Sequence, residues 1–251
     1  MKVVSVVNQK GGVGKTTTSV SLSAALGVYE KKTLLIDLDP QGNSTSGIGI
    51  NKNKVNSQVY KMLIGEKNIK SCIVKSNYKK LDVIPADINL TGAEIELVKE
   101  YAREQKLKTA LAPILEDYEY IIIDCPPSLG LLTINALTAS THVLLPIQCE
   151  YYALEGVSQL LNTIKLIQNN LNPNLEILGV LLTMYDKRLN LSQQVEEDVK
   201  NYFGDKLFKT YINRNVKLSE APSFGQTIFD YAIASRGAQD YLNLVKEVVA
   251  R

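Results

Sequence analysis

The stretch KGGVGKTT, residues 10–17, decides the fold of this chain. It follows an apolar segment, Val3–Val7, that has the pattern of a β-strand, and it opens a segment, Thr16–Tyr29, with helical periodicity. A glycine-rich turn between a strand and a helix lets backbone N–H groups close around phosphate oxygens, and the helix N-terminus adds its dipole. The residues expected to bind the phosphates are Lys10, Gly11, Gly12, Val13, Gly14, Lys15, Thr16 and Thr17.

Three side chains of this loop indicate a nucleoside triphosphate with Mg²⁺. Lys15 is placed to reach the β- and γ-phosphates, and the Thr16 hydroxyl is placed to ligate the metal. Thr17 is placed to cap the α-phosphate. A plain glycine turn ahead of a helix predicts neither Lys15 nor Thr16, so the pattern favours a nucleotide-binding loop.

Outward from the loop, short apolar runs alternate with helical patterns along the whole chain. The runs are nearly continuous in apolar character, which is typical of parallel strands covered on both faces. The alternation predicts an α/β fold with a mostly parallel central β-sheet and helices on both faces. Without a linker or repeat, residues 1–251 are expected to form a single domain. The expected strands are Val3–Val7, Thr33–Leu38, Leu81–Ile84, Tyr120–Ile123, His142–Ile147, Leu175–Leu182 and Leu207–Ile212. The expected helices are Thr16–Tyr29, Ala93–Leu115, Ala153–Leu171, Leu191–Phe203 and Arg236–Val249.

The composition of the 251 residues excludes several classes of protein. Hydrophobic residues make up 45% and charged residues 22%, which is ordinary for a globular protein and argues against disorder. The net charge of +2 argues against a permanently basic coat for nucleic acid. No apolar run approaches the about 18–20 residues that span a bilayer, and the N-terminus does not have the pattern of a signal peptide. The three cysteines are scattered and odd in number, and there is one histidine, so reduced thiols are favoured over disulfides or a zinc site. We therefore expect a cytoplasmic protein.

Two further expected strands end in carboxylates. Asp37 and Asp39 lie in DLDPQGN, residues 37–43, and Asp124 ends the apolar run IIID. Ligands of parallel sheets bind at the carboxyl ends of the strands, and carboxylates there repel ATP unless Mg²⁺ neutralises them. We therefore expect these aspartates to hold the metal or to position water. The alternative for Asp37 and Asp39 is a turn in which aspartate acts as a cap, and Asp124 alone is a weak motif.

The loop departs from the common Walker A pattern, because Gln9 stands where that pattern begins with glycine and Lys10 follows as a second lysine. This is the deviant Walker A pattern, and it resembles the ParA/MinD branch of P-loop ATPases. The resemblance implies that Lys10 reaches across a dimer interface to the partner's nucleotide. Two alternatives remain open: Lys10 acts within its own chain, or it is a solvated loop lysine.

The resemblance to chromosomal ParA (Soj) proteins covers nearly the whole chain. It is carried by LDVIPADINLTGAEIEL at 81–97, DCPPSLGLLTINALTAS at 124–140, PIQCEYYALEGVSQLL at 146–161, GVLLTMYDKR at 179–188 and NRNVKLSEAPSFGQTI at 213–228. It implies that Asp39 is needed for hydrolysis alongside Lys10 and Lys15, that Asp37 supports the Mg²⁺ shell, and that Asp124 holds the metal through water. It also implies that Met184, Asn213 and Asn215 border the adenine, although many relatives carry proline where this chain has Asn213.

Non-specific DNA binding is also implied by the resemblance, through basic residues on the face opposite the nucleotide loops. The matching positions are Arg188 and Lys217, in a segment, 187–217, with seven basic and four acidic residues. Lys187, Lys206 and Lys209 are expected to add phosphate contacts. Residues 51–80, with eight lysines and one acid, are either a second DNA-binding surface, a docking surface for a partner or a solvated helical face.

The function implied is that of an ATP-hydrolysing switch in chromosome or plasmid segregation. ATP and Mg²⁺ are expected to close a homodimer that binds DNA and associates with the nucleoid, until a ParB/Spo0J-type centromere-binding protein stimulates hydrolysis. One alternative is a MinD-like ATPase for division-site placement, although residues 240–251 lack the pattern of a membrane anchor. The others are an ATP-dependent metabolic enzyme on the same fold and a scaffold without turnover, which Asp39 and Asp124 together disfavour.

Overall fold

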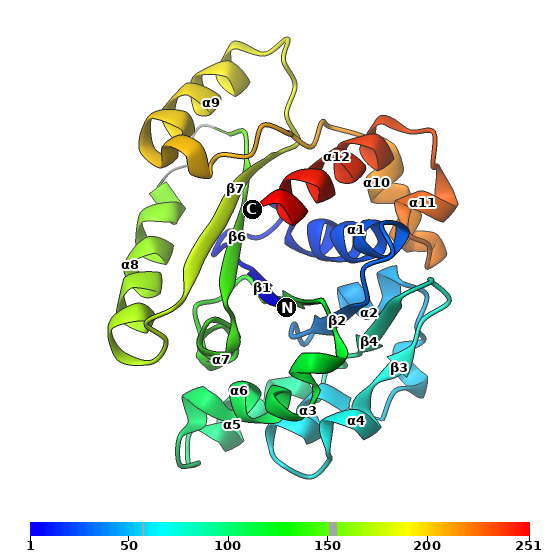
Figure 1. Cartoon of the computed structure of the whole chain (residues 1–251), viewed down its shortest axis with the longest axis vertical. Coiled ribbons are helices and arrows are strands. Elements are labelled where there is room, and N and C mark those ends of the chain that lie inside the picture. The colour runs from blue at the N-terminus through cyan, green and yellow to red at the C-terminus, as the bar shows by residue number, and fades with distance from the viewer. Residues whose placement is uncertain (57, 151–154) are drawn as a thin grey trace.

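The structure is a computed structural model that describes residues 1–56, 58–150 and 155–251 (Figure 1). In this described part, seven strands form one sheet in the order β3-β4-β2-β5-β1-β6-β7. All neighbouring strands are parallel except β3 and β4, which are antiparallel. The strands are β1 (Lys2–Val6), β2 (Thr33–Asp37), β3 (Val74–Lys75), β4 (Leu81–Ile84), β5 (Tyr120–Asp124), β6 (His142–Gln148) and β7 (Glu176–Thr183).

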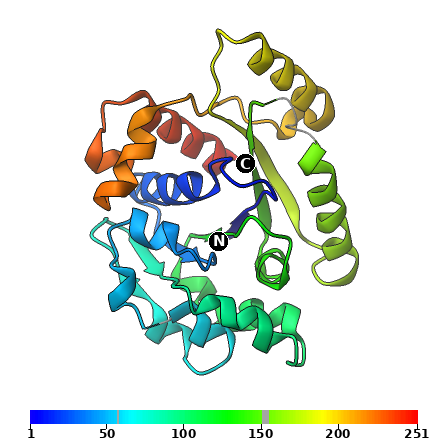
Figure 2. The same cartoon turned by 180° about the vertical axis from the view of Figure 1, so that it is seen from behind.

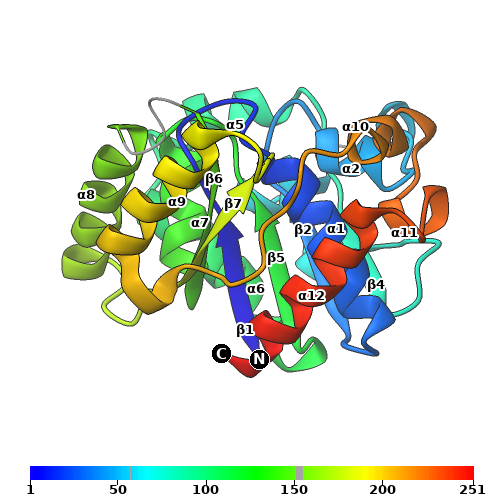
Figure 3. The same ribbon diagram turned by 90° about the horizontal axis from the view of Figure 1, so that it is seen from above.

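Helices cover both faces of the sheet, which confirms the predicted fold class. On one face α1 lies beside α12, as seen from the front and from behind (Figures 1 and 2). Seen from above, α7 and α8 lie on the opposite side of the sheet (Figure 3). The longer helices are α1 (Lys15–Val28), α5 (Leu90–Leu97), α7 (Leu131–Ala139), α8 (Glu155–Asn170), α9 (Asn190–Phe203) and α12 (Arg236–Ala250). The shorter ones are α2 (Asn43–Gly47), α3 (Gln58–Leu63), α4 (Ile69–Cys72), α6 (Lys106–Leu111), α10 (Val216–Glu220) and α11 (Ile228–Tyr231).

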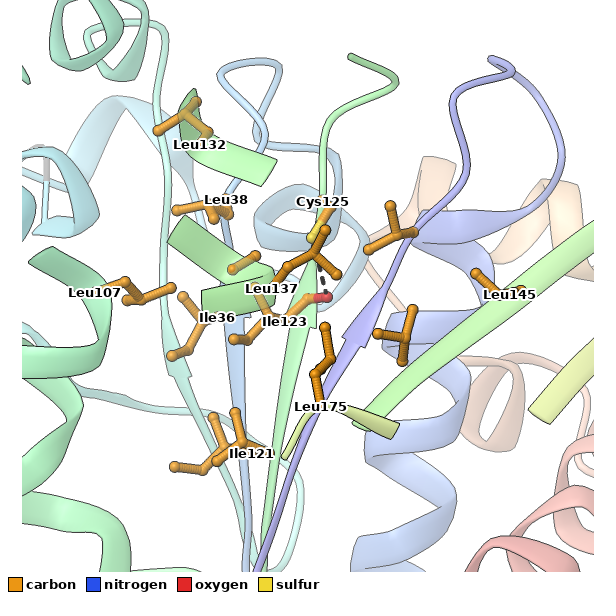
Figure 4. Packing of buried hydrophobic residues seen from close by; sticks show 14 of the residues in the cluster. Ile36, Leu38, Leu107, Ile121, Ile123, Cys125, Leu132, Leu137, Leu145 and Leu175 are labelled. Carbon is orange, nitrogen blue, oxygen red and sulfur yellow. Dashed lines mark hydrogen bonds between the residues drawn. The ribbon is translucent and has the colours of Figure 1, made fainter. Parts of the chain in front are cut away.

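The hydrophobic core is divided by the sheet into two clusters. Successive residues of β5 alternate between them, since Ile121 and Ile123 face one cluster and Ile122 the other. Figure 4 shows the first cluster, in which Ile36, Ile123 and Leu137 pack between the strands and α7. Because both faces are buried, most residues on either side of a strand are apolar, which explains the nearly continuous apolar runs.

The predicted strand Leu207–Ile212 is wrong, because this segment makes only one isolated bridge to β7, between Leu207 and Val180. Phe208 and Ile212 donate backbone hydrogen bonds to β7 carbonyls. The backbone N–H groups of Lys209 and Thr210 instead donate to the carboxylate of Glu247 on α12, at 2.9 and 2.8 Å. The helix therefore takes the donors that a regular strand ladder would use.

The predicted helix Ala93–Leu115 is also wrong as one element, because it is divided into α5, α6 and short 3₁₀ turns. Ala102 between them has a positive φ of 49°. The side chain of Asn135 on α7 accepts from the backbone N–H of Leu107 and donates to the carbonyl of Arg103, so a tertiary partner stabilises the break. The predicted start of the next helix at Ala153 lies outside the described residues, and β3 was too short to be predicted.

Gly27 in α1 offers a test of the close approach between this helix and the sheet edge. A Cβ there would lie 2.5 Å from the backbone carbonyl oxygen of Lys79, whereas a Cβ at Gly92 in α5 would lie 3.5 Å from the ring of Tyr60. We expect Gly27→Ala to lower the free energy of unfolding by about 1–3 kcal/mol through overpacking. Gly92→Ala should be neutral or stabilising by up to about 1 kcal/mol, because alanine favours helix. Urea unfolding of both variants measures the difference, and equal effects would contradict it.

Candidate functional site

The phosphate-binding loop lies between β1 and α1, at the carboxyl edge of the sheet. Gly12 and Gly14 have positive φ angles of 77° and 88°, a conformation that glycine adopts without strain. The Thr183 hydroxyl at the end of β7 donates to the carbonyl of Val13 at 2.9 Å, and its methyl group lies 3.7 Å from the position of a Cβ on Gly14. The end of β7 therefore supports the loop, and a larger residue at position 14 is excluded by backbone conformation.

Lys15 is the buried cation of the loop. Its Nζ donates to the carbonyl of Lys10 at 2.9 Å, across the turn that precedes it. Burial lowers the pKa of Lys15, and the negative charge of Asp124 opposes this effect. A buried ammonium group with a neutral carbonyl partner is well suited to bind a phosphate oxygen.

Lys10 lies at the exposed tip of the loop and forms an ion pair within its own chain. Its Nζ is 2.6 Å from Oε2 of Glu150, and both side chains are nearly half exposed. Glu150 also accepts a hydrogen bond from Gln148 at the end of β6. The sequence contained no pattern that singled out Glu150 as a partner, because it lies 140 residues further along the chain.

Asp37 and Asp124 are register partners on the adjacent strands β2 and β5, and both are fully buried. The structure therefore brings together the two aspartates that the sequence predicted. Burial raises the pKa of Asp37, and the neighbouring charge of Asp124 raises it further. Burial also raises the pKa of Asp124, although hydrogen bonds from Ser44, Thr16 and Ser19 favour its charged form.

Hydroxyl groups from α1 and α2 satisfy these two carboxylates. Ser19 and Ser44 donate to the two oxygens of Asp124 at 2.9 and 2.6 Å. Thr45 donates its backbone N–H and its hydroxyl to Asp37, at 2.8 and 2.7 Å. Sequence reasoning missed these three hydroxyl residues, because serine and threonine are common on helices for other reasons.

Asp39 is buried two residues beyond the end of β2. Its Oδ1 accepts the backbone N–H of Gln41 at 2.8 Å, so the expectation of a turn in which aspartate acts as a cap also holds. In the described part of the chain, no residue donates to its Oδ2. One carboxylate oxygen at the carboxyl edge of the sheet is thus available to a water molecule or another donor.

The donor set fits a magnesium ion that arrives with a nucleotide. Two buried carboxylates repel each other beside the hydroxyl of Thr16, and a divalent cation would relieve that repulsion. Within the described residues, no group of three or more histidine, cysteine or acidic side chains forms a metal cage. Phosphate oxygens and water would therefore complete the coordination shell, as Mg²⁺ commonly requires.

A cavity of about 230 Å³ adjoins Gly14 and Thr17 on the side of α12. Met184, Asn213 and Asn215, all predicted to border the base, line it. The cavity is also lined by Tyr241, whose hydroxyl is 3.1 Å from that of Thr18. We call it the base cavity below.

The predicted DNA-binding residues do not lie opposite the nucleotide loops. Arg188 lies five residues beyond Thr183, which contacts the phosphate loop, and Lys217 lies in α10 between two residues that line the base cavity. Each is held by a nearby acid. Two nitrogens of Arg188 donate to Asp186 at 2.9 and 2.7 Å, and Nζ of Lys217 is 2.9 Å from Glu220.

Arg188 belongs to a basic cavity of about 210 Å³, which Lys187, Arg214 and Arg236 also line. The expected contribution of Lys206 is not supported, because Lys206 lines a different cavity beside His142 at the amino ends of the strands. Sequence reasoning missed Arg214 and Arg236 as members of this cluster, since only the fold brings α12 to the segment after β7.

The lysine-rich segment 51–80 is not one helical face, because it contains α3, α4, β3 and a 3₁₀ turn. Acids outside the segment or across its hairpin pair with several of its lysines. The ion pairs are Lys70–Asp117 at 3.7 Å, Lys75–Asp82 at 2.8 Å and Lys79–Glu30 at 2.6 Å. The local excess of positive charge is therefore smaller on the surface than in the sequence.

A phosphate loop with two lysines, ahead of a helix and beside strand-end aspartates, defines a P-loop nucleoside triphosphatase of the deviant Walker A type. The AAA domain family matches residues 1–177. The chain is 59% identical to the sporulation initiation inhibitor protein Soj of Bacillus subtilis, covering 99% of this chain and 98% of the relative. It is 50% identical to the chromosome partitioning protein ParA of Myxococcus xanthus, covering 100% and 88%. The chain belongs to the ParA/Soj family of chromosome-partitioning ATPases.

A solved structure of the same fold is the cobyrinic acid a,c-diamide synthase of Mycobacterium smegmatis with bound ADP and magnesium. It is 39% identical to this chain with a TM-score of 0.86, and the match covers 98% of this chain and 93% of that one. Within the described residues, every helix is too short or too polar to cross a membrane.

The raised pKa of Asp37 predicts how the nucleotide-free protein responds to pH. With a folded-state pKa of about 7 against about 4 when unfolded, the protonated carboxyl favours folding at low pH, and this contribution is lost as the pH rises toward 7. Asp37→Asn cannot ionise, so its stability relative to the parent should improve by about 2 kcal/mol between pH 5 and pH 8. Urea unfolding at both pH values measures this change. The exposed Asp198→Asn on α9 is the control, and a parallel response of both variants would contradict the prediction.

Proposed function

We propose that this chain is an ATP-hydrolysing molecular switch that acts in chromosome or plasmid segregation. The observation that carries the proposal is the buried Lys15 beside the Asp37–Asp124 pair, at the sheet edge where the phosphate loop begins α1. Kinship with Soj and ParA supports the partitioning role. Backbone N–H groups of the loop and Lys15 bind the phosphates, and the base cavity receives the adenine.

The hydrolytic step follows from the positions of the loop and of Asp39. A bound Mg²⁺ ion would neutralise part of the phosphate charge. The residues that would hold it, directly or through water, are Thr16, Asp37 and Asp124. Lys15 stabilises negative charge that develops on the γ-phosphate as water attacks in line. Asp39 orients that water through its unoccupied carboxylate oxygen.

An ATP-bound homodimer is the proposed active state. Lys10 lies at the exposed tip of the loop, so its side chain is accessible to a second subunit. To reach a partner's nucleotide, it must leave Glu150 of its own chain. An exposed ion pair of this kind contributes about 0–1 kcal/mol, so the phosphates of a bound nucleotide are strong competitors for Lys10.

Non-specific DNA binding is proposed for the dimer, with Arg188 and Lys217 as phosphate contacts. The basic cavity around Arg188 supports this assignment, because it gathers four cations on one surface. Each phosphate neutralised contributes about one unit to the salt dependence, so one patch binds weakly. Two patches in a dimer bind more tightly, which makes DNA binding, and the association with the nucleoid, dependent on ATP.

The proposed partner that stimulates hydrolysis is a ParB/Spo0J-type centromere-binding protein. We also propose that the chain works in the cytoplasm. The alternative of a metabolic enzyme is favoured only by the likeness to the diamide synthase. ATP turnover with and without DNA and the ParB-type protein distinguishes the two. Turnover that responds to both supports a partition switch, and turnover that responds to neither contradicts it.

Substitution of Asp39 tests the role of this carboxylate in hydrolysis. If Asp39 orients the attacking water, Asp39→Ala should bind ATP but hydrolyse it at least about 100-fold more slowly, and so accumulate as a dimer. Size-exclusion chromatography with ATP and Mg²⁺ detects the dimer. Lys15→Ala, which should not bind ATP, is the control that remains monomeric. A monomeric Asp39→Ala protein that retains ATP binding would refute this role.

Charge reversal tests the DNA-binding surface. The double variant Arg188→Glu, Lys217→Glu should lose ATP-dependent DNA retention, while ATP affinity changes less than about 2-fold because neither side chain lines the base cavity. The matched control is Lys106→Glu, Lys108→Glu, which reverses the same number of charges on α6 and should retain DNA. Electrophoretic mobility shifts with an arbitrary duplex report both results. Equal loss in the two double variants would count against the assignment.

A further inference from the structure

The amide of Asn213 is held at the wall of the base cavity by Asp240 on α12. The backbone N–H and the side-chain Nδ2 of Asn213 both donate to Oδ2 of Asp240, each at 2.9 Å. Nδ2 also lies 3.4 Å from the carbonyl oxygen of Tyr211. Both protons of the amide group are thereby directed at protein acceptors.

These acceptors fix the orientation of the amide. A carboxylate and a backbone carbonyl only accept hydrogen bonds, so Asn213 must present its NH₂ group to them. Its Oδ1 is left as the remaining hydrogen-bonding atom, and no donor among the described residues reaches it. Asn213 therefore offers an acceptor, and not a donor, to a ligand.

The carboxylate of Asp240, which accepts these hydrogen bonds from Asn213, has a rigid support. Asp240 is buried, with an exposed fraction of 7%, and Nε of Arg236 lies 3.9 Å from its other oxygen. The next residue, Tyr241, is fully buried, lines the base cavity and contacts Thr18 of α1 through its hydroxyl. Because α12 packs along α1, the backbone at Asp240 is held in place against the helix that follows the phosphate loop.

We propose that Asp240 is a positioning residue that fixes Asn213 as an acceptor for the exocyclic amino group of adenine, and so selects ATP against 6-oxo purine nucleotides. This inference rests on the proposed binding of a nucleoside triphosphate. A 6-oxo purine carries an acceptor at that position, so two acceptors would face each other and neither would be satisfied. A site built to hydrogen-bond one group discriminates against analogues that lack it.

Competition between ATP and inosine triphosphate tests the proposal, because the two ligands differ at the 6-position and the adjoining ring nitrogen. Displacement of a fluorescent ATP analogue gives both dissociation constants with Mg²⁺ present. The parent protein should prefer ATP. Asn213→Ala, which keeps the backbone bond to Asp240, should weaken ATP binding about 3- to 10-fold and leave inosine triphosphate within about 2-fold. Asp240→Ala should reduce the preference similarly, because the amide is then free to rotate.

Two variants separate positioning from general support of the fold. Asp240→Asn keeps an oxygen that accepts both N–H groups and should retain the preference. Glu247→Ala removes the other α12 carboxylate that braces the same segment, at Lys209 and Thr210, and should weaken both nucleotides equally or neither. Equal affinities in the parent, or equal losses for both nucleotides in the Asn213 and Asp240 alanine variants, would overturn the inference alone. Absence of binding to either triphosphate in the parent would instead contradict the proposed function.

Discussion

The placement of two buried carboxylates side by side is the constraint on which the site depends. The parallel register of β2 and β5 pairs Asp37 with Asp124, away from water and close to Lys15. Like charges in such a position destabilise the fold unless they are protonated or hydrogen bonded. The hydroxyls of Ser19, Ser44 and Thr45 supply those bonds, and in doing so they attach α1 and α2 to the strand ends. The same repulsion makes the site receptive to a divalent cation.

The parts of the fold that sequence patterns predict are those determined by local chemistry. The six parallel strands were recognisable because burial on both faces leaves mostly apolar residues, and the phosphate loop because few other turns need two lysines and three glycines. The failures have tertiary causes. Glu247 diverts the donors of Lys209 and Thr210 from a strand ladder, and Asn135 stabilises the break before α6. No pattern within either segment contains its distant partner.

The residues of the candidate site also fall into two groups, those predictable from local sequence and those placed by tertiary contacts. Asp37 and Asp124 end strands, and Asp39 and Lys15 lie just beyond the carboxyl ends of strands, so the position of all four is set by the sheet and was predictable. Residues that complete the site come from elsewhere in the chain: Asp240 reaches Asn213 across 27 positions and Glu150 reaches Lys10 across 140. Their roles depend on side-chain contacts that periodicity does not encode. The structure also places Arg188 and Lys217 near the base cavity, and not on the opposite face that the resemblance implied.

The position of these basic residues near the base cavity affects how the small net charge of the chain is interpreted. One helix, α12, supplies Tyr241 to the base cavity and Arg236 to the basic cavity, so the two surfaces share a rigid element. The candidate DNA contacts are already paired, Arg188 with Asp186 and Lys217 with Glu220. If these residues bind DNA as proposed, the DNA phosphates would compete with these internal carboxylates, which would weaken binding by a single subunit. In the proposed dimer, a duplicated surface would overcome that competition through effective concentration, and binding would then end when the dimer separates.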